Sequence, residues 1–459
     1  MKNVSRKTGI DKIEETDDNI TGRGGLAFFV RYLTNIGIFS LLIGHFGDLR
    51  KSRKGLPVED LFRQIFCWFL DGTSRHISWF DELAKDAGYA GTIEQSPDKM
   101  ASSHAIKRFL RSFGIFKTWI FRKILKKMFI WRLRIANPAV IYIDIDTMVM
   151  NNDDAAGREG VGPTYKNTAG FQPLQLTWGR FVIDAVFRGG KCHSNHGKTV
   201  IKIITELVNL VRKEYREDAV IVLTGDSGFS DQKNFEAFEK LGICYAFGGR
   251  ITKDIGKVVT SLAENAFGEF EKGKQRWRFA DFGFIYGTWN MFRRLIFCQP
   301  VYKDGQMLLP FDRAETVIIT NIRSDTVGDD MPEELTRLTD PANIVALYHS
   351  RGAAELVFRS LKDFGFEQMP FRKFPPNAAL YYMMPVAFFL FEAFKEDILA
   401  PVIPLESYAG TVRRKFIDIA AKIVSHAGRI TLKLTSAVFR RLKLRKIWEA
   451  CHRAVPLIC

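Results

Sequence analysis

The sequence predicts an α/β fold, in which a mixed sheet interrupted by a β-rich insertion lies between two helical regions. From Leu26 to about Ile135, apolar residues recur at helical spacing and no convincing strand stands out. From residue 137 onward, short apolar runs rich in β-branched residues alternate with helical segments, as in a sheet covered by helices. This alternation is lost between about residues 250 and 340, and helical periodicity then returns.

The central region supplies the elements of the predicted sheet. The expected order is a strand at Ala139–Asp146, strands at Leu174–Trp178 and Phe181–Phe187, a helix at Lys198–Tyr215, a strand at Ala219–Asp226, a helix at Gln232–Leu241 and a strand at Ile243–Phe247. Gly179 and Arg180, between the second and third strands, indicate a hairpin. Antiparallel strands that lead into a parallel α/β section give the order of a ribonuclease H-like sheet.

Three alternating apolar runs predict that the insertion is a β-rich subdomain. They lie around Trp277–Trp289, Arg294–Tyr302 and Thr316–Ile322, and a helix is expected after them from about Asn343 to Phe364. The predicted organisation is a flexible N-terminus (1–20), a helical DNA-binding domain (21–136), a ribonuclease H-like catalytic core in two parts (137–249 and 341–375), the insertion (250–340) and a helical C-terminal region (376–459).

The chain is strongly basic. It has 67 Lys and Arg against 51 Asp and Glu, which gives a net charge of +16 and indicates a polyanionic partner, most commonly nucleic acid. The alternative is a charge excess that serves only solubility. Basic residues crowd into a loop at Arg50–Lys54 and into the segment from Ser102 to Arg134.

The segment Ser102–Arg111 resembles a DNA recognition helix. Short polar residues at its start could meet base edges, while Lys107, Arg108 and Arg111 reach phosphates. The alternative is an amphipathic surface helix that turns Ile106, Phe109 and Leu110 to the core, and both descriptions can hold at once.

Several other classes of protein are disfavoured. The six cysteines show no C-x-x-C spacing, so neither a zinc site nor a disulfide framework is signalled. The polar N-terminus has no signal-peptide pattern, and the apolar run Ala378–Phe394, which contains Pro385 and Glu392, is more typical of a buried helix than of a membrane span. We therefore expect a cytoplasmic protein with no membrane partner.

Acidic residues stand where predicted strands end. Asp146 and Asp226 both close strands that are otherwise apolar, at the edge where ligands of open α/β sheets gather. Each could also be an ordinary turn residue. Asp144 points to the same face as Asp146, because side chains alternate along a strand, and either of the two could be a metal ligand. Asp146 is preferred because it is nearer the strand end.

A third candidate acid follows the insertion. On a continuous helix, Tyr348, Arg351, Glu355 and Lys362 would share one stripe roughly 60° wide, bordered by Arg359. The alternative is a solvated face with a weak i,i+4 pair between Arg351 and Glu355. If Asp146, Asp226 and Glu355 meet, they could hold two Mg²⁺ or Mn²⁺ ions beside a cationic surface that suits a phosphate backbone.

The spacing of these residues resembles that of DDE transposases of bacterial insertion sequences, in the cut-and-paste group with a Y-x2-R-x3-E-x6-K signature. All four signature positions match at Tyr348, Arg351, Glu355 and Lys362. The segments that also resemble the family are Asp144–Thr147, Gly225–Phe229, Arg188–Asn195 and Gly410–Phe416. The resemblance covers about residues 20 to 445, and the segment Asn151–Gly170 has no motif that can be assigned.

The resemblance implies a function as well as a fold. A member of this family has a ribonuclease H-like core, with Asp146, Asp226 and Glu355 as the catalytic, metal-binding residues. It would bind the inverted-repeat ends of an insertion sequence as a homodimer, cleave them with two Mg²⁺ or Mn²⁺ ions and join the 3′-OH to target DNA, in the bacterial cytoplasm at the nucleoid. Tyr348, Arg351 and Lys362 would contact end phosphates, and Trp277 or Trp289 would stack on a flipped base.

Two rival functions share the same fold. One is a catalytically inactive, transposase-derived DNA-binding protein, and the other is a ribonuclease H-like nuclease that cuts without strand transfer. The presence of all three acids argues against the first.

Overall fold

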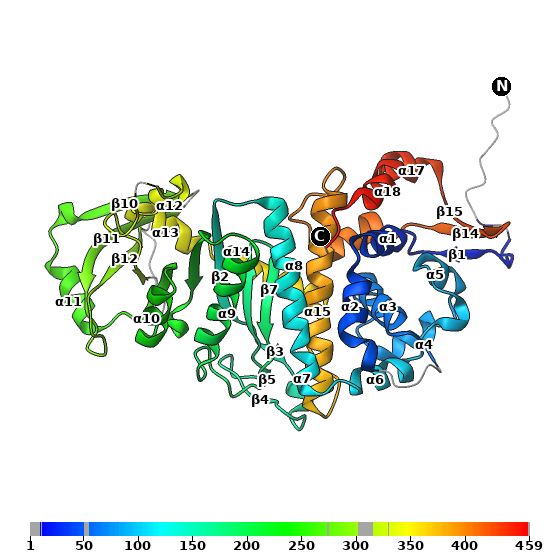
Figure 1. Ribbon diagram of the computed structural model, residues 1–459, viewed down its shortest axis with the longest axis horizontal. Helices are drawn as coiled ribbons and strands as arrows, with labels where there is room; N and C mark the ends of the chain where they lie inside the picture. Colours follow the sequence, from blue (N-terminus) through cyan, green and yellow to red (C-terminus); the bar gives the residue numbers. More distant parts are fainter. Residues whose placement is uncertain are drawn as a thin grey trace.

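A nine-stranded mixed sheet forms the centre of the computed structural model, which describes residues 10, 12–49, 55–272, 275–301, 315–328 and 330–457 (Figure 1). The strand order is β10-β11-β12-β13-β9-β8-β2-β6-β7. The basic loop expected at Arg50–Lys54 lies outside the described residues, as do residues 1–9 and 11 of the N-terminal segment expected to be flexible.

The five strands predicted for the core are all confirmed. They are β2 (Val140–Thr147), β6 (Leu174–Trp178), β7 (Phe181–Val186), β8 (Val220–Gly225) and β9 (Cys244–Gly249). β2 pairs antiparallel with β6 and parallel with β8, and β6 and β7 form the expected hairpin. The predicted helices α9 (Thr199–Glu214) and α10 (Gln232–Lys240) follow in order. Apolar, β-branched strands end in polar residues here because only the strand interiors are covered on both faces.

The insertion is β-rich, as predicted, but its strands do not form a separate sheet. They are β10 (Phe267–Lys272), β11 (Gln275–Phe284), β12 (Arg293–Val301) and β13 (Thr316–Thr320). β13 pairs antiparallel with β9 of the core, so the insertion continues the catalytic sheet without a break. The short helices α11 (Lys253–Ser261) and α12 (Glu333–Arg337) flank these strands.

The N-terminal helices pack around one long buried helix from the C-terminal half. They are α1 (Leu26–Ile36), α2 (Ile38–Phe46), α3 (Val58–Asp71), α4 (Phe80–Leu83), α5 (Ala87–Thr92), α6 (Ser103–Arg111), α7 (Ile115–Thr118) and α8 (Ile120–Ala136). The long helix α15 (Phe374–Phe394) runs between α8, which lies on the sheet, and the helices α2 and α3, and it contacts α3, α8 and β7 (Figure 1). The N-terminal helices and the sheet therefore share one core.

Among the described residues, α15 and the π-helical turn after it, Phe374–Leu399, are long and apolar enough to cross a membrane. The whole apolar window of this segment is buried inside the protein, as is typical of a core helix. Arg132 of α8 is almost fully buried and forms ion pairs of 2.8 Å with Asp397 and 2.7 Å with Glu396, at the end of this segment. These two ion pairs hold α8 against the end of the segment Phe374–Leu399.

The two ends of the chain meet in a small antiparallel sheet, which corrects the prediction that both end regions are free of strands. β1 (Asn19–Thr21) pairs with β14 (Ala421–His426), which pairs with β15 (Arg429–Leu434). The turn between β14 and β15 has Ala427 at φ 49° and Gly428 at φ 74°, the left-handed geometry of a tight hairpin turn.

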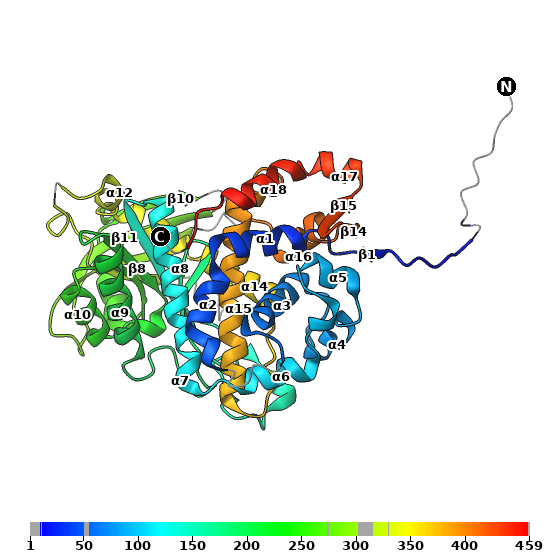
Figure 2. The same ribbon diagram turned by 45° about the vertical axis from the view of Figure 1, so that its right-hand side comes forward.

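The rest of the C-terminal region is helical, as predicted, with α16 (Ala409–Val412) before this hairpin and α17 (Ser436–Arg441) and α18 (Leu444–Arg453) after it. α18 lies against α1, so the last helix covers the first (Figure 2).

Candidate active site

Asp146 and Asp226 lie side by side at one edge of the central sheet. In the parallel register of β2 and β8, Asp144 is opposite Thr224 and Ile145 is opposite Gly225, so the next step brings Asp146 beside Asp226. Asp144, Asp146 and Asp226 share one face of the sheet, because side chains alternate along each strand. The 2.7 Å hydrogen bond from Thr224 Oγ1 to Asp144 Oδ1 lies on that same face. The structure therefore places these two aspartates beside one another, and their role as metal ligands stays a prediction.

The two carboxylates are poorly compensated by protein charge. Burial, together with the negative charges of Asp226 and Asp144, raises the pKa of Asp146 to about 7. Burial likewise raises the pKa of Asp226, although the Gly228 N–H donates to its Oδ1 at 2.9 Å. Two half-buried acids of like charge are unfavourable in the ionised state unless a cation joins them. Their oxygen atoms are the donors that hard divalent ions prefer, so this pair fits a Mg²⁺ or Mn²⁺ ion.

Asp144 is different, because it already has a counter-charge. Arg351 Nε lies 2.5 Å from Asp144 Oδ1, and Nη2 lies 3.4 Å from Oδ2. Burial opposes the charge on Arg351, but the ion pair with Asp144 outweighs it and raises the pKa of the guanidinium. Asp146 therefore remains the better candidate for the first metal ligand, and Asp144 holds Arg351 in place.

The helix that follows the insertion is broken in two, which corrects the prediction of one continuous stripe. α13 (Pro341–His349) ends with Tyr348 in its last turn, and α14 (Gly352–Phe364) begins after Arg351. The Ser350 hydroxyl bonds back to the Leu347 carbonyl at 2.6 Å, which competes with the helical hydrogen-bond pattern, and Gly352 favours helix weakly. Tyr348 and Arg351 therefore reach the site from either side of a bend.

Tyr348 packs over the end of β9. A Cβ atom at Gly248 would lie 2.4 Å from the Tyr348 hydroxyl, so only glycine allows the tyrosine to approach this strand so closely. The Arg351 guanidinium lies 5.6 Å from the centroid of the Tyr348 ring. The signature tyrosine and arginine thus form one unit beside Asp144 and Asp226, and burial raises the pKa of Tyr348.

The third acid is not brought into ligand contact with the aspartates. Glu355 is exposed on the first half of α14. In the part of the chain that the structure describes, no group of three His, Cys, Asp or Glu side chains is arranged to hold a metal ion. Farther along α14, Arg359 lies over the Tyr408 ring, with 5.8 Å to the centroid, and Lys362 pairs with Glu367 at 2.5 Å. These two cations are therefore directed to other partners.

One side chain that the sequence did not single out lies within electrostatic reach of all three acids. The Tyr165 hydroxyl donates to the carbonyl of Thr147, the residue after Asp146, at 3.3 Å. Partial burial, and then the negative charges of Asp146, Asp226 and Glu355, raise the pKa of Tyr165 to about 12. The segment Asn151–Gly170, to which no motif could be assigned, therefore borders the candidate site.

That segment forms a small sheet supported by Arg188. The strands are β3 (Met150–Asn151), β4 (Gly162–Pro163) and β5 (Ala169–Phe171). The buried Arg188 guanidinium donates to the Gln172 carbonyl at 3.0 Å, to the Ser194 carbonyl at 3.2 Å and to Thr147 Oγ1 at 3.2 Å. It thereby ties the strand end after Asp146 to the loop that resembles the family's loop between the two aspartates.

Both candidate tryptophans of the insertion are packed against protein. Trp277 on β11 is 8% exposed and stacks on His349, with 4.7 Å between ring centroids. Trp289 packs edge-on against Phe235 of α10, and the Arg293 guanidinium lies 5.0 Å from its ring centroid. Phe292, by contrast, is 64% exposed. Stacking of either tryptophan on a base stays a prediction.

The candidate recognition helix is amphipathic, as expected. The Ser102 hydroxyl accepts the Ala105 N–H at 3.2 Å and caps α6, while Ile106, Phe109 and Leu110 are buried. Arg108 and Arg111 are exposed, and Lys107 is half-buried. The apolar face of α6 therefore packs on the core and its basic face stays outside.

Comparison with known proteins identifies the family. The family model described as "Transposase DDE domain group 1" matches residues 11–456. No curated protein sequence matches the chain. Among solved structures, a cryo-EM structure of a piggyBac transposase synaptic complex with hairpin DNA is 15% identical, has a TM-score of 0.42, and covers 96% of this chain and 88% of that chain. A likeness at this level does not by itself establish a shared fold. Because the family model spans nearly the whole length, the chain belongs to the DDE transposase family.

Proposed function

We propose that the chain is the transposase of a bacterial insertion sequence, which binds the inverted-repeat ends, cleaves them and joins their 3′-OH groups to target DNA. The observation that carries the proposal is the pair Asp146 and Asp226, two poorly compensated carboxylates at one sheet edge in a chain of this family. The strand order β9-β8-β2-β6-β7, with β2 central and β6 antiparallel, supports a ribonuclease H-like core.

Asp146 and Asp226, joined by Glu355 after a movement of α14 toward them, are the residues that would hold two Mg²⁺ or Mn²⁺ ions. Such ions supply Lewis-acid stabilisation of the anionic charge in phosphodiester hydrolysis and strand transfer. The protein's own contribution is electrostatic and positional. Arg351, fixed by Asp144 and stacked beside Tyr348, presents a permanent positive charge next to the aspartates, which suits a phosphate of the bound DNA end.

The basic face of α6 is our proposed element for sequence recognition. Lys107, Arg108 and Arg111 are available for phosphate contacts, and Arg359 and Lys362 on α14 would extend these contacts toward the cleaved end. We further propose a homodimeric complex with two DNA ends, in the bacterial cytoplasm at the nucleoid. Trp277 and Trp289 stay candidates for stacking on a flipped base.

The decisive test is a cleavage assay on duplexes that carry the element's ends, with Mg²⁺, resolved on a denaturing gel. We expect Glu355→Ala to abolish cleavage and leave end binding unchanged, because Glu355 is exposed and lies on a different helix from α6. Glu333→Ala is the matched control, because Glu333 is an exposed helical glutamate on α12 that pairs only locally with Arg337. Normal cleavage by Glu355→Ala would contradict the assignment.

The same assay separates the rival functions. A wild-type protein that binds ends and never cuts them would be an inactive DNA-binding relative. A protein that cuts ends and gives no joined product with target DNA would be a nuclease without strand transfer. Cleavage followed by joining supports the proposed transposase.

A further inference from the structure

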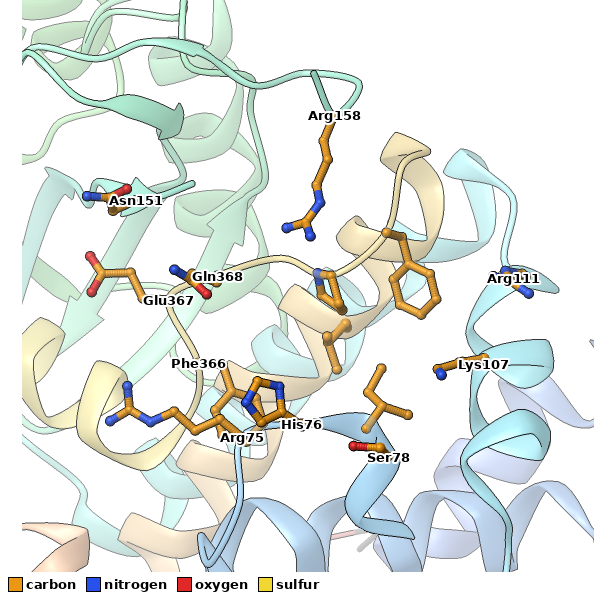
Figure 3. Close-up of a pocket in the computed structure, with 14 residues that line it drawn as sticks. Arg75, His76, Ser78, Lys107, Arg111, Asn151, Arg158, Phe366, Glu367 and Gln368 are labelled. Atoms are coloured by element: carbon orange, nitrogen blue, oxygen red, sulfur yellow. The ribbon is translucent and has the colours of Figure 1, made fainter. Parts of the chain in front are cut away.

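A basic pocket lies between the N-terminal helices and the catalytic core, away from the aspartates. It has a volume of about 810 Å³ and is lined by three separate parts of the chain. Arg75, His76 and Ser78 come from the segment after α3, and Lys107 and Arg111 come from α6. The opposite wall is formed by Asn151 and Arg158 near the small sheet and by residues of the segment 366–371 between α14 and α15 (Figure 3).

The pocket has a large excess of positive charge. Arg75, Lys107, Arg111 and Arg158 line it and come from three parts of the chain. Its acidic lining residue is Glu367, and that carboxylate is engaged by Lys362 of α14 at 2.5 Å. Within the described part of the chain, Arg75, Lys107, Arg111 and Arg158 form no ion pair. Lys107 is close enough to Asp81 to help lower the pKa of that carboxyl, whereas Arg75, Arg111 and Arg158 have no ion-pair partner among the described residues. The cavity therefore has an excess of positive charge that favours binding of an anion.

Protein contacts orient two of these cations. Arg158 donates to the Met369 carbonyl, so its guanidinium is held over the pocket, and Figure 3 shows it reaching in from the side opposite Lys107 and Arg111. Arg111 lies over the Phe371 ring, with 5.8 Å to the centroid. Both contacts leave the charge itself unneutralised. Such fixed, unpaired guanidinium groups are typical of phosphate-binding surfaces.

The basic surface continues beyond this pocket. A neighbouring hollow of about 630 Å³ shares Arg111 and Phe371 with it and adds Arg372 and Lys373. Lys373 forms a long ion pair with Glu159, with 3.8 Å between Nζ and Oε2. The two hollows thus form one cationic track around Phe371, longer than a single phosphate or nucleotide needs.

We propose that this track binds the phosphodiester backbone of double-stranded DNA and bridges α6 to the catalytic core. The inference rests on the proposed function and extends it to Arg75, His76 and Arg158, which no family motif includes. The geometry favours duplex DNA because α6 supplies part of the wall. If α6 reads base edges, the backbone flanking those bases must pass Lys107 and Arg111 and so enter the pocket.

The experiment uses the full-length protein, the double variant Arg75→Ala/Arg158→Ala and a fluorescent duplex that carries the element's end. Binding is measured over a range of salt concentrations. Each lost phosphate contact lowers the slope of log K against log salt by about 0.9, so the double variant should lower it by nearly 2 and weaken binding about 10- to 100-fold at low salt. Arg75→Lys/Arg158→Lys should keep the slope, because the charges remain.

The control is Lys257→Ala, which removes an exposed cation on α11, at the far end of the molecule from α6 (Figure 1). It should change neither slope nor affinity. Melting temperatures of all variants within about 2 °C of wild type exclude unfolding as the cause. Wild-type slope and affinity in the double variant would overturn the inference. So would displacement of the duplex by inorganic phosphate or a mononucleotide at equal phosphate concentration, since the site would then hold a small anion.

Failure of this inference and failure of the proposed function give different results. If the wild-type protein cleaves and joins ends while the double variant binds them normally, only the DNA track is wrong. If the wild-type protein binds duplex DNA through the track and never cleaves it, the track is correct and the transposase activity is not.

Discussion

Arg351 and Asp144 form an ion pair, with 2.5 Å between Nε and Oδ1, that joins the start of α14 to the strand carrying Asp146. Both side chains are largely buried, so the pair is shielded from solvent. The start of α14 and the strand that carries Asp146 are therefore joined by a direct contact. This contact also distinguishes two aspartates that the sequence leaves equivalent, because Arg351 forms an ion pair with Asp144 and acts on Asp146 only from farther away.

The first prediction distinguishes these two aspartates. Asp144→Asn leaves the buried Arg351 without its counter-charge, and breaking a buried pair in this way should cost about 3 kcal/mol of unfolding free energy. Asp146→Asn removes a poorly compensated charge and should not destabilise the protein, yet it should abolish Mg²⁺-dependent cleavage. Urea denaturation and the end-cleavage assay measure the two effects. If Asp144→Asn abolished cleavage without destabilising the protein, and Asp146→Asn destabilised it without affecting cleavage, Asp144 would be the metal ligand.

The second prediction concerns pH in the absence of divalent ions. The pKa of Asp146 is about 7 in the folded protein, above its ordinary value of 3.8, so the folded state holds its proton more tightly than the unfolded state. The contribution of Asp146 to stability is therefore present at low pH and lost as pH rises from about 4 to about 7. Over this window Asp146→Asn should gain stability relative to wild type. A constant difference from pH 4 to 8 in EDTA would disprove it.

The third prediction concerns Arg188, which donates to backbone carbonyls and to Thr147 Oγ1 from a buried position. A lysine cannot reproduce this planar fork of donors. Arg188→Lys should reduce the cleavage rate by about 10-fold or more with little change in duplex affinity, since the loop beside Asp146 loses its anchor. Cleavage at the wild-type rate, in a variant that melts at a lower temperature, would show that Arg188 supports only the fold.

The fourth prediction tests the contact between α8 and the segment after α15. Arg132 is 1% exposed and pairs with Asp397 and Glu396. Arg132→Ala removes the cation from this cluster, and Glu396 then keeps Arg180 and Asp397 keeps the Tyr32 hydroxyl as partners. The change should cost about 3 kcal/mol of unfolding free energy. Arg134→Ala is the matched control on the same helix, because Arg134 is exposed and donates only to the Glu214 carbonyl. Equal stability of the two variants would contradict this account.

Local patterns predicted the central sheet well. The strands that carry Asp146 and Asp226 are each apolar, β-branched and flanked by turn residues, so their ends could be read to within a residue or two. The parallel pairing of β2 with β8 then brings the two acids together at the carboxyl ends of their strands. This part of the site was predictable because each strand is specified by its own residues.

Other features depend on contacts that no local pattern contains. The break between α13 and α14 arises where Ser350 bonds back to Leu347, and helical periodicity continues across it. Tyr165 reaches the Asp146 strand only because β3, β4 and β5 fold its loop back over the sheet edge. The β14–β15 hairpin did have a local signal, in the alternating apolar residues on either side of Ala427 and Gly428.

The pairing of β1 with β14 has a consequence for damaged copies of the gene. The segment that precedes α1 pairs with a strand some 400 residues later in the sequence, and α18 covers α1. A truncated product that ends before β14 would therefore leave β1 without its partner strand and α1 exposed. The stability of the amino-terminal helices thus depends on residues that the ribosome adds only after the central sheet has been made.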